Sequence, residues 1–116
     1  MELPHCYIIC FTLFSIIYAN TEFKNLEKKL KGKIVGSVYL KGSTGYNERR
    51  IVHNALCEDI FPDLIVVPKS TEDVSEIVKI TNEFNVNISV RSGGHSYTCT
   101  SIRKGKEKVR LEANCF

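Results

Sequence analysis

Residues 63–91 contain the pattern that most constrains the fold of this chain. The run DLIVVP is continuously apolar between Asp63 and Pro68, which is typical of a buried strand. The segment that follows has the spacing of an amphipathic helix, and the alternating run VNISVR predicts a second strand. Strand, helix and strand in this order are expected to pack as a right-handed βαβ unit, so the fold class is α+β.

The helix of this unit has clear start and stop signals. Ser70 is suited to be its N-cap, and Asp73 stands three residues later, where a capping box needs an acidic side chain. Asn85 can end the helix in a left-handed conformation. Five residues at helical spacing are expected to face the sheet, namely Val74, Ile77, Val78, Thr81 and Phe84.

Residues 1–19 are expected to be a signal peptide. The run CYIICFTLFSIIYA, residues 6–19, has the length of a signal-peptide hydrophobic region and is short for a membrane span. Ala19 supplies a small residue for cleavage and is followed by polar sequence, although no Lys or Arg precedes the apolar run. We expect a secreted chain, or one in the lumen of the endoplasmic reticulum, with no membrane contact after signal removal.

Residues 20–62 are expected to form a helix, a strand and a loop ahead of the βαβ unit. Phe23, Leu26 and Leu30 have helical spacing, with Thr21 as a candidate N-cap and Gly32 as a stop. The run KIVGSVYL predicts a short strand, and KGSTGYNERR predicts a loop. The following segment, up to residue 63, shows no clear pattern.

Three cysteines remain after signal removal, Cys57, Cys99 and Cys115. In an oxidising compartment the simplest arrangement is one disulfide and one remaining thiol, with Cys57–Cys99 as the ordinary pairing. A zinc site is the alternative, because His53 and Cys57 have the same spacing as His95 and Cys99. Structural zinc sites usually pair Cys with Cys and His with His, which favours the disulfide.

The charge of the chain gives no reason to expect a nucleic-acid partner. Sixteen Lys and Arg against thirteen Asp and Glu leave a formal charge of +3. The basic runs, residues 24–33 and 103–110, have no interleaved aromatic residues to stack on bases. They are interpreted as solvated surface.

The second strand ends in RSGGHS, residues 91–96, which is the candidate functional site. Ligands of α/β sheets bind beyond the carboxyl ends of strands, and consecutive glycines let backbone N–H groups converge on an anion. A diphosphate suits such a loop, and the hydroxyls of Ser92 and Ser96 can add donors. The patterns G-x-G-x-x-G and G-x-x-x-x-G-K-[ST] are both absent from the sequence.

The run from residue 62 to residue 101 strongly resembles the flavin-binding domain of FAD-linked oxidases. The resemblance is to the p-cresol methylhydroxylase and vanillyl-alcohol oxidase fold (PCMH-type), in its berberine-bridge-enzyme-like branch. It rests on a strand ending in Pro, a capped helix and a strand ending in RSGGHSY. The upstream run YNERRIVHN is similar to a family pattern at Tyr46, Arg50 and Asn54.

The resemblance implies a cofactor and roles for the loop residues. The backbone from Arg91 to Ser96, which includes Ser92, Gly93 and Gly94, would hold the FAD diphosphate. His95 would bond covalently to the flavin through its 8α-methyl carbon. The whole protein would be a secreted oxidase that transfers hydride from an alcohol or sugar-like donor to the flavin, and then electrons to oxygen.

Departures from the family qualify this expectation. Family members are several hundred residues long, so residues 63–116 are expected to be a truncated FAD-binding segment that is inactive alone. A small-molecule substrate is expected only if the full-length domain is present. The charged residues after Ser101 look unlike a core strand, and Cys115 comes too early to be a second flavin link. A small secreted binding module without catalysis remains the alternative.

Overall fold

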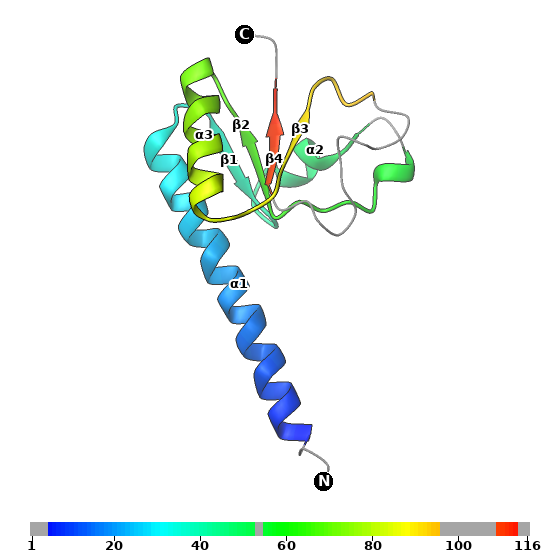
Figure 1. Ribbon diagram of the computed structural model, residues 1–116. Helices are drawn as coiled ribbons and strands as arrows, with labels where there is room; N and C mark the ends of the chain where they lie inside the picture. The colour runs from blue at the N-terminus through cyan, green and yellow to red at the C-terminus, as the bar shows by residue number, and fades with distance from the viewer. Residues whose placement is uncertain (1–4, 53–54, 96–108, 114–116) are drawn as a thin grey trace.

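The computed structural model describes residues 5–52, 55–95 and 109–113. The chain forms an α+β structure whose helices and strands follow one another in the order shown in Figure 1. The elements are α1 (His5–Lys33), β1 (Ser37–Leu40), α2 (Tyr46–Arg50), a 3₁₀ turn η1 (Ala55–Cys57), β2 (Leu64–Val67), α3 (Thr71–Glu83), β3 (Ile88–Arg91) and β4 (Val109–Glu112).

The four strands form one sheet in the order β1-β2-β4-β3. Strand β1 is antiparallel to β2, whereas β2, β4 and β3 are parallel to one another. The predicted strand–helix–strand unit is confirmed as β2, α3 and β3, but its two strands are not neighbours, because β4 lies between them. The expectation that the segment after Ser101 would not supply a core strand was therefore wrong.

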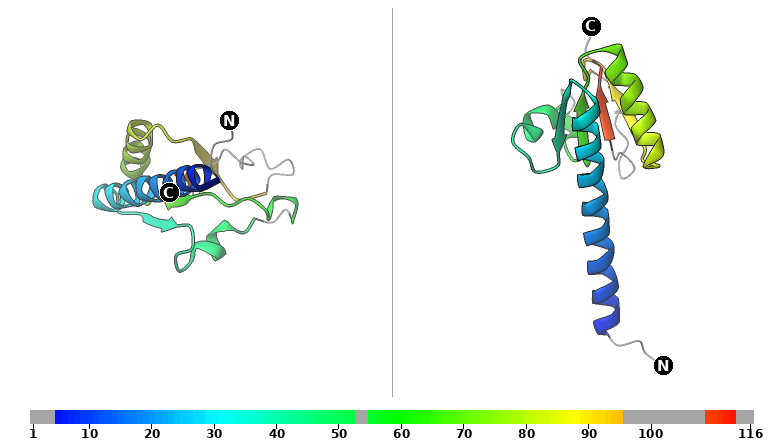
Figure 2. Two further views of the ribbon diagram at one scale, coloured as in Figure 1. Left: turned by 90° about the horizontal axis from the view of Figure 1, so that it is seen from below. Right: turned by 90° about the vertical axis from the view of Figure 1, so that its left-hand side faces the viewer.

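The core lies between one face of the sheet and two helices. Figures 1 and 2 show α3 and the C-terminal half of α1 on this face, with α2 on the other. Alternate residues of the strands point into this core, because side chains alternate across a sheet. The buried core residues are Phe23, Leu26, Leu30, Ile34, Val38, Leu64, Val66, Ile77, Ile80, Val109 and Leu111.

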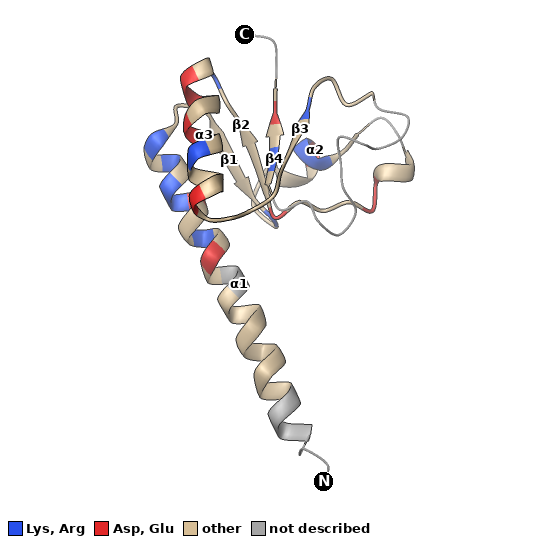
Figure 3. Cartoon of the chain, viewed as in Figure 1, with Lys and Arg blue, Asp and Glu red and all other residues tan. Residues whose placement is uncertain are grey.

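Helix α1 is continuous through the position where two separate segments were expected. Thr21 is not an N-cap, because its hydroxyl donates to the carbonyl of Ile17 within the helix. Residues 9–18 are exposed, whereas Phe23, Leu26 and Leu30 are buried as predicted. Figure 3 shows that the described charges of α1 lie on the part next to the sheet domain. No helix among the described residues is long and apolar enough to cross a membrane.

The signals that bound α3 are confirmed, with one change in its buried face. The Ser70 hydroxyl accepts a hydrogen bond from the N–H of Asp73, and Asn85 has a φ of 51°. Ile80 is buried and Val78 is 51% exposed, so Ile80 takes the place predicted for Val78. The helix faces both the sheet and α1, which turns its buried stripe towards Ile80.

Helix α2 forms where a loop was expected. Gly45, with a φ of 82°, precedes it, and the helix runs through Tyr46, Asn47, Glu48, Arg49 and Arg50. The Tyr46 ring is buried, and its hydroxyl donates to the carbonyl of Pro62, just ahead of β2. This tertiary contact, which spacing along the chain does not reveal, holds a helix too short to be stable alone.

The Asp73 carboxylate joins the α1–β1 connection to the start of α3. It accepts hydrogen bonds from the N–H groups of Val35, Gly36 and Lys69, at 2.9, 2.8 and 2.9 Å. The predicted capping box is thus half formed, since Asp73 binds these three amides and Ser70 alone caps the helix. Burial pushes the pKa of Asp73 upward, but the three amides outweigh it and hold the pKa below its ordinary value.

We predict that Asp73→Asn lowers the free energy of unfolding by about 1 to 3 kcal/mol at pH 7, because buried N–H groups lose their acceptor. The folded-state pKa lies below the unfolded value, so the stabilisation is complete above about pH 4 and is lost as the pH falls through the folded-state pKa. Urea unfolding at pH 7 and at lower pH measures both effects.

Asp59→Asn is the matched control for this experiment, because Asp59 is exposed. It is expected to leave the urea midpoint unchanged. Equal effects of the two substitutions, or a difference between Asp73→Asn and the parent that persists at the lowest pH, would contradict the role given to Asp73.

Candidate functional site

The loop after β3, Ser92–His95, lies beyond the carboxyl ends of parallel strands. Strands β2, β4 and β3 all run in the same direction, and Arg91 and Glu112, the last residues of β3 and β4, are register partners. Ligands of such sheets bind at this edge. The structure thus places the loop where the sequence predicted a binding site, on an edge strand with β4 as its only neighbour among the described residues.

Both glycines of the loop adopt conformations that other residues rarely tolerate. Gly93 has a φ of 62° and Gly94 a φ of 72°, both in the left-handed region. The N–H of Gly94 donates to the carbonyl of Ser92 at 2.6 Å, which closes a tight turn. In the described part of the chain, the N–H groups of Ser92 and Gly93 have no protein acceptor. The turn therefore leaves two consecutive exposed residues with donors for an anion.

His95 follows the turn and is exposed. Its ring packs beside Gly93, since a Cβ placed on Gly93 would come within 3.3 Å of the His95 Cδ2 atom. The side chain at the end of the turn is thus accessible to a bound molecule and close to the two N–H donors.

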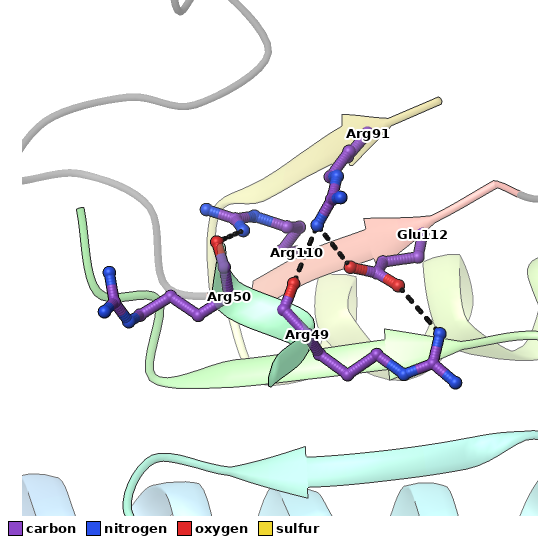
Figure 4. A network of polar contacts seen from close by, with 5 residues as sticks. All are labelled: Arg49, Arg50, Arg91, Arg110 and Glu112. Carbon is purple, nitrogen blue, oxygen red and sulfur yellow. Dashed lines mark hydrogen bonds and ion pairs between the residues drawn. The ribbon is translucent and has the colours of Figure 1, made fainter. Parts of the chain in front are cut away.

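A polar network lies next to this loop, on the face of the sheet that α2 covers. The Arg91 guanidinium donates to a Glu112 carboxylate oxygen at 2.9 Å and to the carbonyl of Arg49 at 2.7 Å (Figure 4). The other Glu112 oxygen forms an ion pair with Arg49 at 3.5 Å. Arg110 is fully buried and donates to the carbonyl of Arg50 at 3.1 Å. The network therefore connects β3, β4 and α2.

Positive charge exceeds negative charge among the described side chains of this network. The guanidinium groups of Arg49 and Arg91 meet the single carboxylate of Glu112, whereas those of Arg110 and Arg50 point away from it (Figure 4). Arg50 instead contacts the Phe61 ring, at 4.2 Å from its centroid, and the carbonyl of Glu58. The cationic excess favours a negatively charged molecule at this edge.

Sequence reasoning found the loop and missed Arg49, Arg110 and Glu112. Residues 103–110 were interpreted as solvated surface, whereas Arg110 is buried in β4; Glu112, in a segment that looked unlike a core strand, is buried in the same strand. The alternation of VRLE was the only available signal, since it puts Val109 and Leu111 on one face and both charges on the other.

Several residues singled out from the sequence lie outside the described part of the chain. These are Ser96, Asn54, His53, Cys99 and Cys115. Their predicted roles, including that of Ser96 in the loop and of Asn54 in the upstream motif, stay predictions. Tyr46 and Arg50 of the same motif contact the segment before β2, through the carbonyls of Pro62 and Glu58.

Cys57 is buried and takes part in a disulfide. A disulfide sulfur is not a zinc-binding thiolate, so this state of Cys57 argues against the zinc alternative. No group of three metal-ligating side chains occurs among the described residues. The pairing with Cys99 stays a prediction.

An apolar hollow lies elsewhere and does not belong to this site. It is lined by Phe14, Ile17, Tyr18, Thr21, Glu22, Asn25 and Phe84, so it lies between the exposed part of α1 and the end of α3. None of these residues belongs to the loop or to the arginine network.

Comparison with known proteins finds similarity to FAD-binding proteins. A family model described as an FAD binding domain matches residues 62–114. The FAD-linked oxidoreductase nodO of Hypoxylon pulicicidum is 39% identical over 66 residues, which are 57% of this chain and 15% of that protein.

Solved structures share the fold. The Physcomitrella patens protein BBE-like 1 has a TM-score of 0.64 and 25% identity, over 75% of this chain and 18% of its own. Berberine bridge enzyme of Eschscholzia californica has a TM-score of 0.63 and 24% identity, over 75% and 19%. Phl p 4.0202, described as a glucose dehydrogenase, has a TM-score of 0.67 and 22% identity, over 76% and 20%. The chain thus spans a fifth or less of these relatives.

The fold and the matched segment define part of a flavin-binding domain. Residues 62–114 match the FAD binding domain family, and the fold is that of the PCMH-type domain of berberine bridge enzyme-like proteins. The cofactor of this family is FAD, as the sequence resemblance implied.

We predict that Glu112→Ala lowers the free energy of unfolding by about 3 kcal/mol, because it leaves Arg91 largely buried without its carboxylate. Glu83→Ala is the control, since the Lys29–Glu83 pair is 42% and 56% exposed. Its removal should cost less than about 1 kcal/mol. Urea unfolding of both variants measures the difference, and equal midpoints would show that Glu112 does not hold the network.

Proposed function

We propose that the Ser92–His95 loop is the FAD-binding site of this chain and that His95 carries the flavin. The observation that supports this most directly is the arrangement of His95. It is an exposed imidazole at the carboxyl ends of parallel strands, directly after a turn with two unused N–H donors. An FAD-binding domain needs such a place for a diphosphate and a ring close together.

The residues around the loop fit a diphosphate in two ways. The N–H groups of Ser92 and Gly93 and the exposed Ser92 hydroxyl are neutral hydrogen-bond donors. They can bind a diphosphate without any charged side chain losing its hydration. The cationic excess of Arg49, Arg91 and Arg110 over Glu112 supplies a favourable field without direct contact. Ser96 is a further candidate donor.

His95 would be joined to FAD by one carbon–nitrogen bond between an imidazole nitrogen and the 8α-methyl carbon. Forming this bond releases one proton from the methyl group and one from the imidazole, and two electrons pass to the flavin ring. Dioxygen is the terminal acceptor, and it takes up the two electrons and two protons as hydrogen peroxide. The imidazole is a suitable nucleophile for this step, and its exposure gives the ring access.

The reaction of the whole protein would be oxidation of a small alcohol or sugar-like molecule. Bound FAD supplies a two-electron acceptor for hydride, and oxygen receives the electrons afterwards. The chain spans 15% of nodO and 18–20% of the structural relatives, so we propose that these residues alone bind the cofactor without turning over a substrate.

Covalent attachment predicts a mass change that depends on His95. The chain is expressed through a secretory pathway, incubated with FAD and denatured. Intact mass should then show the increment of one FAD, with flavin fluorescence retained on the denatured protein. His95→Ala should lose both signals, because the attacking nitrogen is gone.

His53→Ala is the control, since it removes the other histidine of the expected mature chain. It should load FAD like the parent. A colourless parent protein at its bare mass would refute flavin attachment by this chain and would favour a non-catalytic secreted module.

We also propose that residues 1–19 are removed during secretion. The exposure of α1 supports this, because residues 9–18 lie outside the core, and Phe23 is the first buried residue among those of the helix whose burial is described. Cleavage after Ala19 would remove the exposed apolar surface and keep Phe23, Leu26 and Leu30, which hold α1 against the sheet. It would also open the hollow between α1 and Phe84.

Secretion predicts a mature chain that begins at Asn20, detectable by N-terminal sequencing of protein from the medium. Ala19→Leu should block cleavage, because the processing site needs a small residue there. Tyr18→Leu, one residue earlier, should be cleaved normally. Retention of the parent chain inside the cell with Met1 or Glu2 at its start would contradict the signal peptide.

A further inference from the structure

Arg91 is largely covered by the loop that it precedes and by its neighbours. It is the last residue of β3, and its side chain is 19% exposed. One of its terminal nitrogens, Nη1, donates both to Glu112 and to the carbonyl of Arg49 (Figure 4). The guanidinium is thereby held by β4 on one side and by α2 on the other.

Gly94 rests on this guanidinium. A Cβ at Gly94 would lie 2.9 Å from Nε, 3.0 Å from Nη2 and 3.3 Å from Cζ of Arg91. A flexible side chain could ordinarily move out of the way, but the bonds to Glu112 and Arg49 restrain this one. The turn from Ser92 to Gly94 therefore closes directly over a group whose position is set by two other elements.

Arginine is suited to this place for a geometric reason. Its planar guanidinium can bind a carboxylate and a carbonyl while presenting the rest of the group to Gly94. A lysine ammonium keeps the charge but offers one nitrogen at the end of a flexible chain. Lysine at position 91 should therefore keep much of the ion pair with Glu112 but less of the contact that supports the turn.

We propose that Arg91 is a positioning residue for flavin attachment, which fixes the Ser92–Gly94 turn and through it the direction of His95. This inference rests on the proposed function, in which His95 carries the flavin. The predicted diphosphate contact of residue 91 was through its backbone, and the proposal adds a separate role for its side chain, which is engaged by Glu112, Arg49 and Gly94.

The first test needs no flavin. Amide hydrogen exchange is measured for the parent, Arg91→Met and Arg91→Lys. Arg91→Met should speed exchange at Gly94 by about tenfold or more, the size expected for loss of a charge-assisted hydrogen bond, while amides of Ile77 and Ile80 keep the parent rates. Arg91→Lys should fall between them. Parent-like exchange at Gly94 in Arg91→Met would overturn the inference, as would equal acceleration at Ile77 and Ile80.

A pair of glycine substitutions separates the contact with Arg91 from backbone strain. Gly94→Ala and Gly42→Ala both place alanine at a positive φ, of 72° and 86°, but a Cβ on Gly42 meets nothing within 4 Å. Gly94→Ala should speed exchange at His95 beyond any change that Gly42→Ala causes there. Equal effects of the two substitutions would show that the contact between Gly94 and Arg91 does not hold the turn.

The second test measures attachment of FAD over time by intact mass. Arg91→Met and Gly94→Ala should load FAD at least about tenfold more slowly than the parent, with Arg91→Lys intermediate. The reason is that His95 is no longer held in the direction that attachment needs. Gly42→Ala should load normally. Parent-like loading in Arg91→Met would overturn the link to His95. A parent that loads no FAD would refute the proposed function, and the exchange measurement would still decide the role of Arg91 in the turn.

Discussion

The Glu112 carboxylate is the point at which the strands and α2 are joined on the site side of the sheet. It lies at the end of the central strand, beside its register partner Arg91, and it binds Arg91 and Arg49 with separate oxygens. Charges that are largely buried are costly unless each has a partner, so an arrangement that left Arg91 without Glu112 would be disfavoured. A shift of β4 by one residue would move both of its charges to the apolar face. The ion pair therefore specifies the register of β4 between β2 and β3 more than it adds stability.

The same interaction connects the fold to its site. With β4 in this register, Arg91 lies under Gly94, and the turn above it needs two glycines because both positions have positive φ. The loop at this edge of the sheet is thus supported by a side chain from its own strand. His95 stays exposed while the residues before it are held.

Asp73 plays a comparable part on the other side of the molecule, where one carboxylate binds three backbone amides from two connections. Neither acidic residue was given this role from the sequence. Asp73 was expected to complete a capping box, and Glu112 lay in a charged segment that looked unlike a core strand. In both cases the partners are distant along the chain, and spacing carries no information about such contacts.

The sequence by itself determined the elements whose signals are local. The apolar run of β2, the Ser70 cap, the stop at Asn85 and the glycine loop after β3 all depend on neighbours within a few residues, and the structure has each of them. Only the tertiary structure decided that β4 is central, that α2 is helical, that α1 continues through Thr21 and that Ile80 replaces Val78 in the core. These outcomes depend on burial against segments that are distant along the chain. The charged strand β4 can be buried only where Arg49 and Arg91 meet its carboxylate, and the short helix α2 persists only where Tyr46 packs.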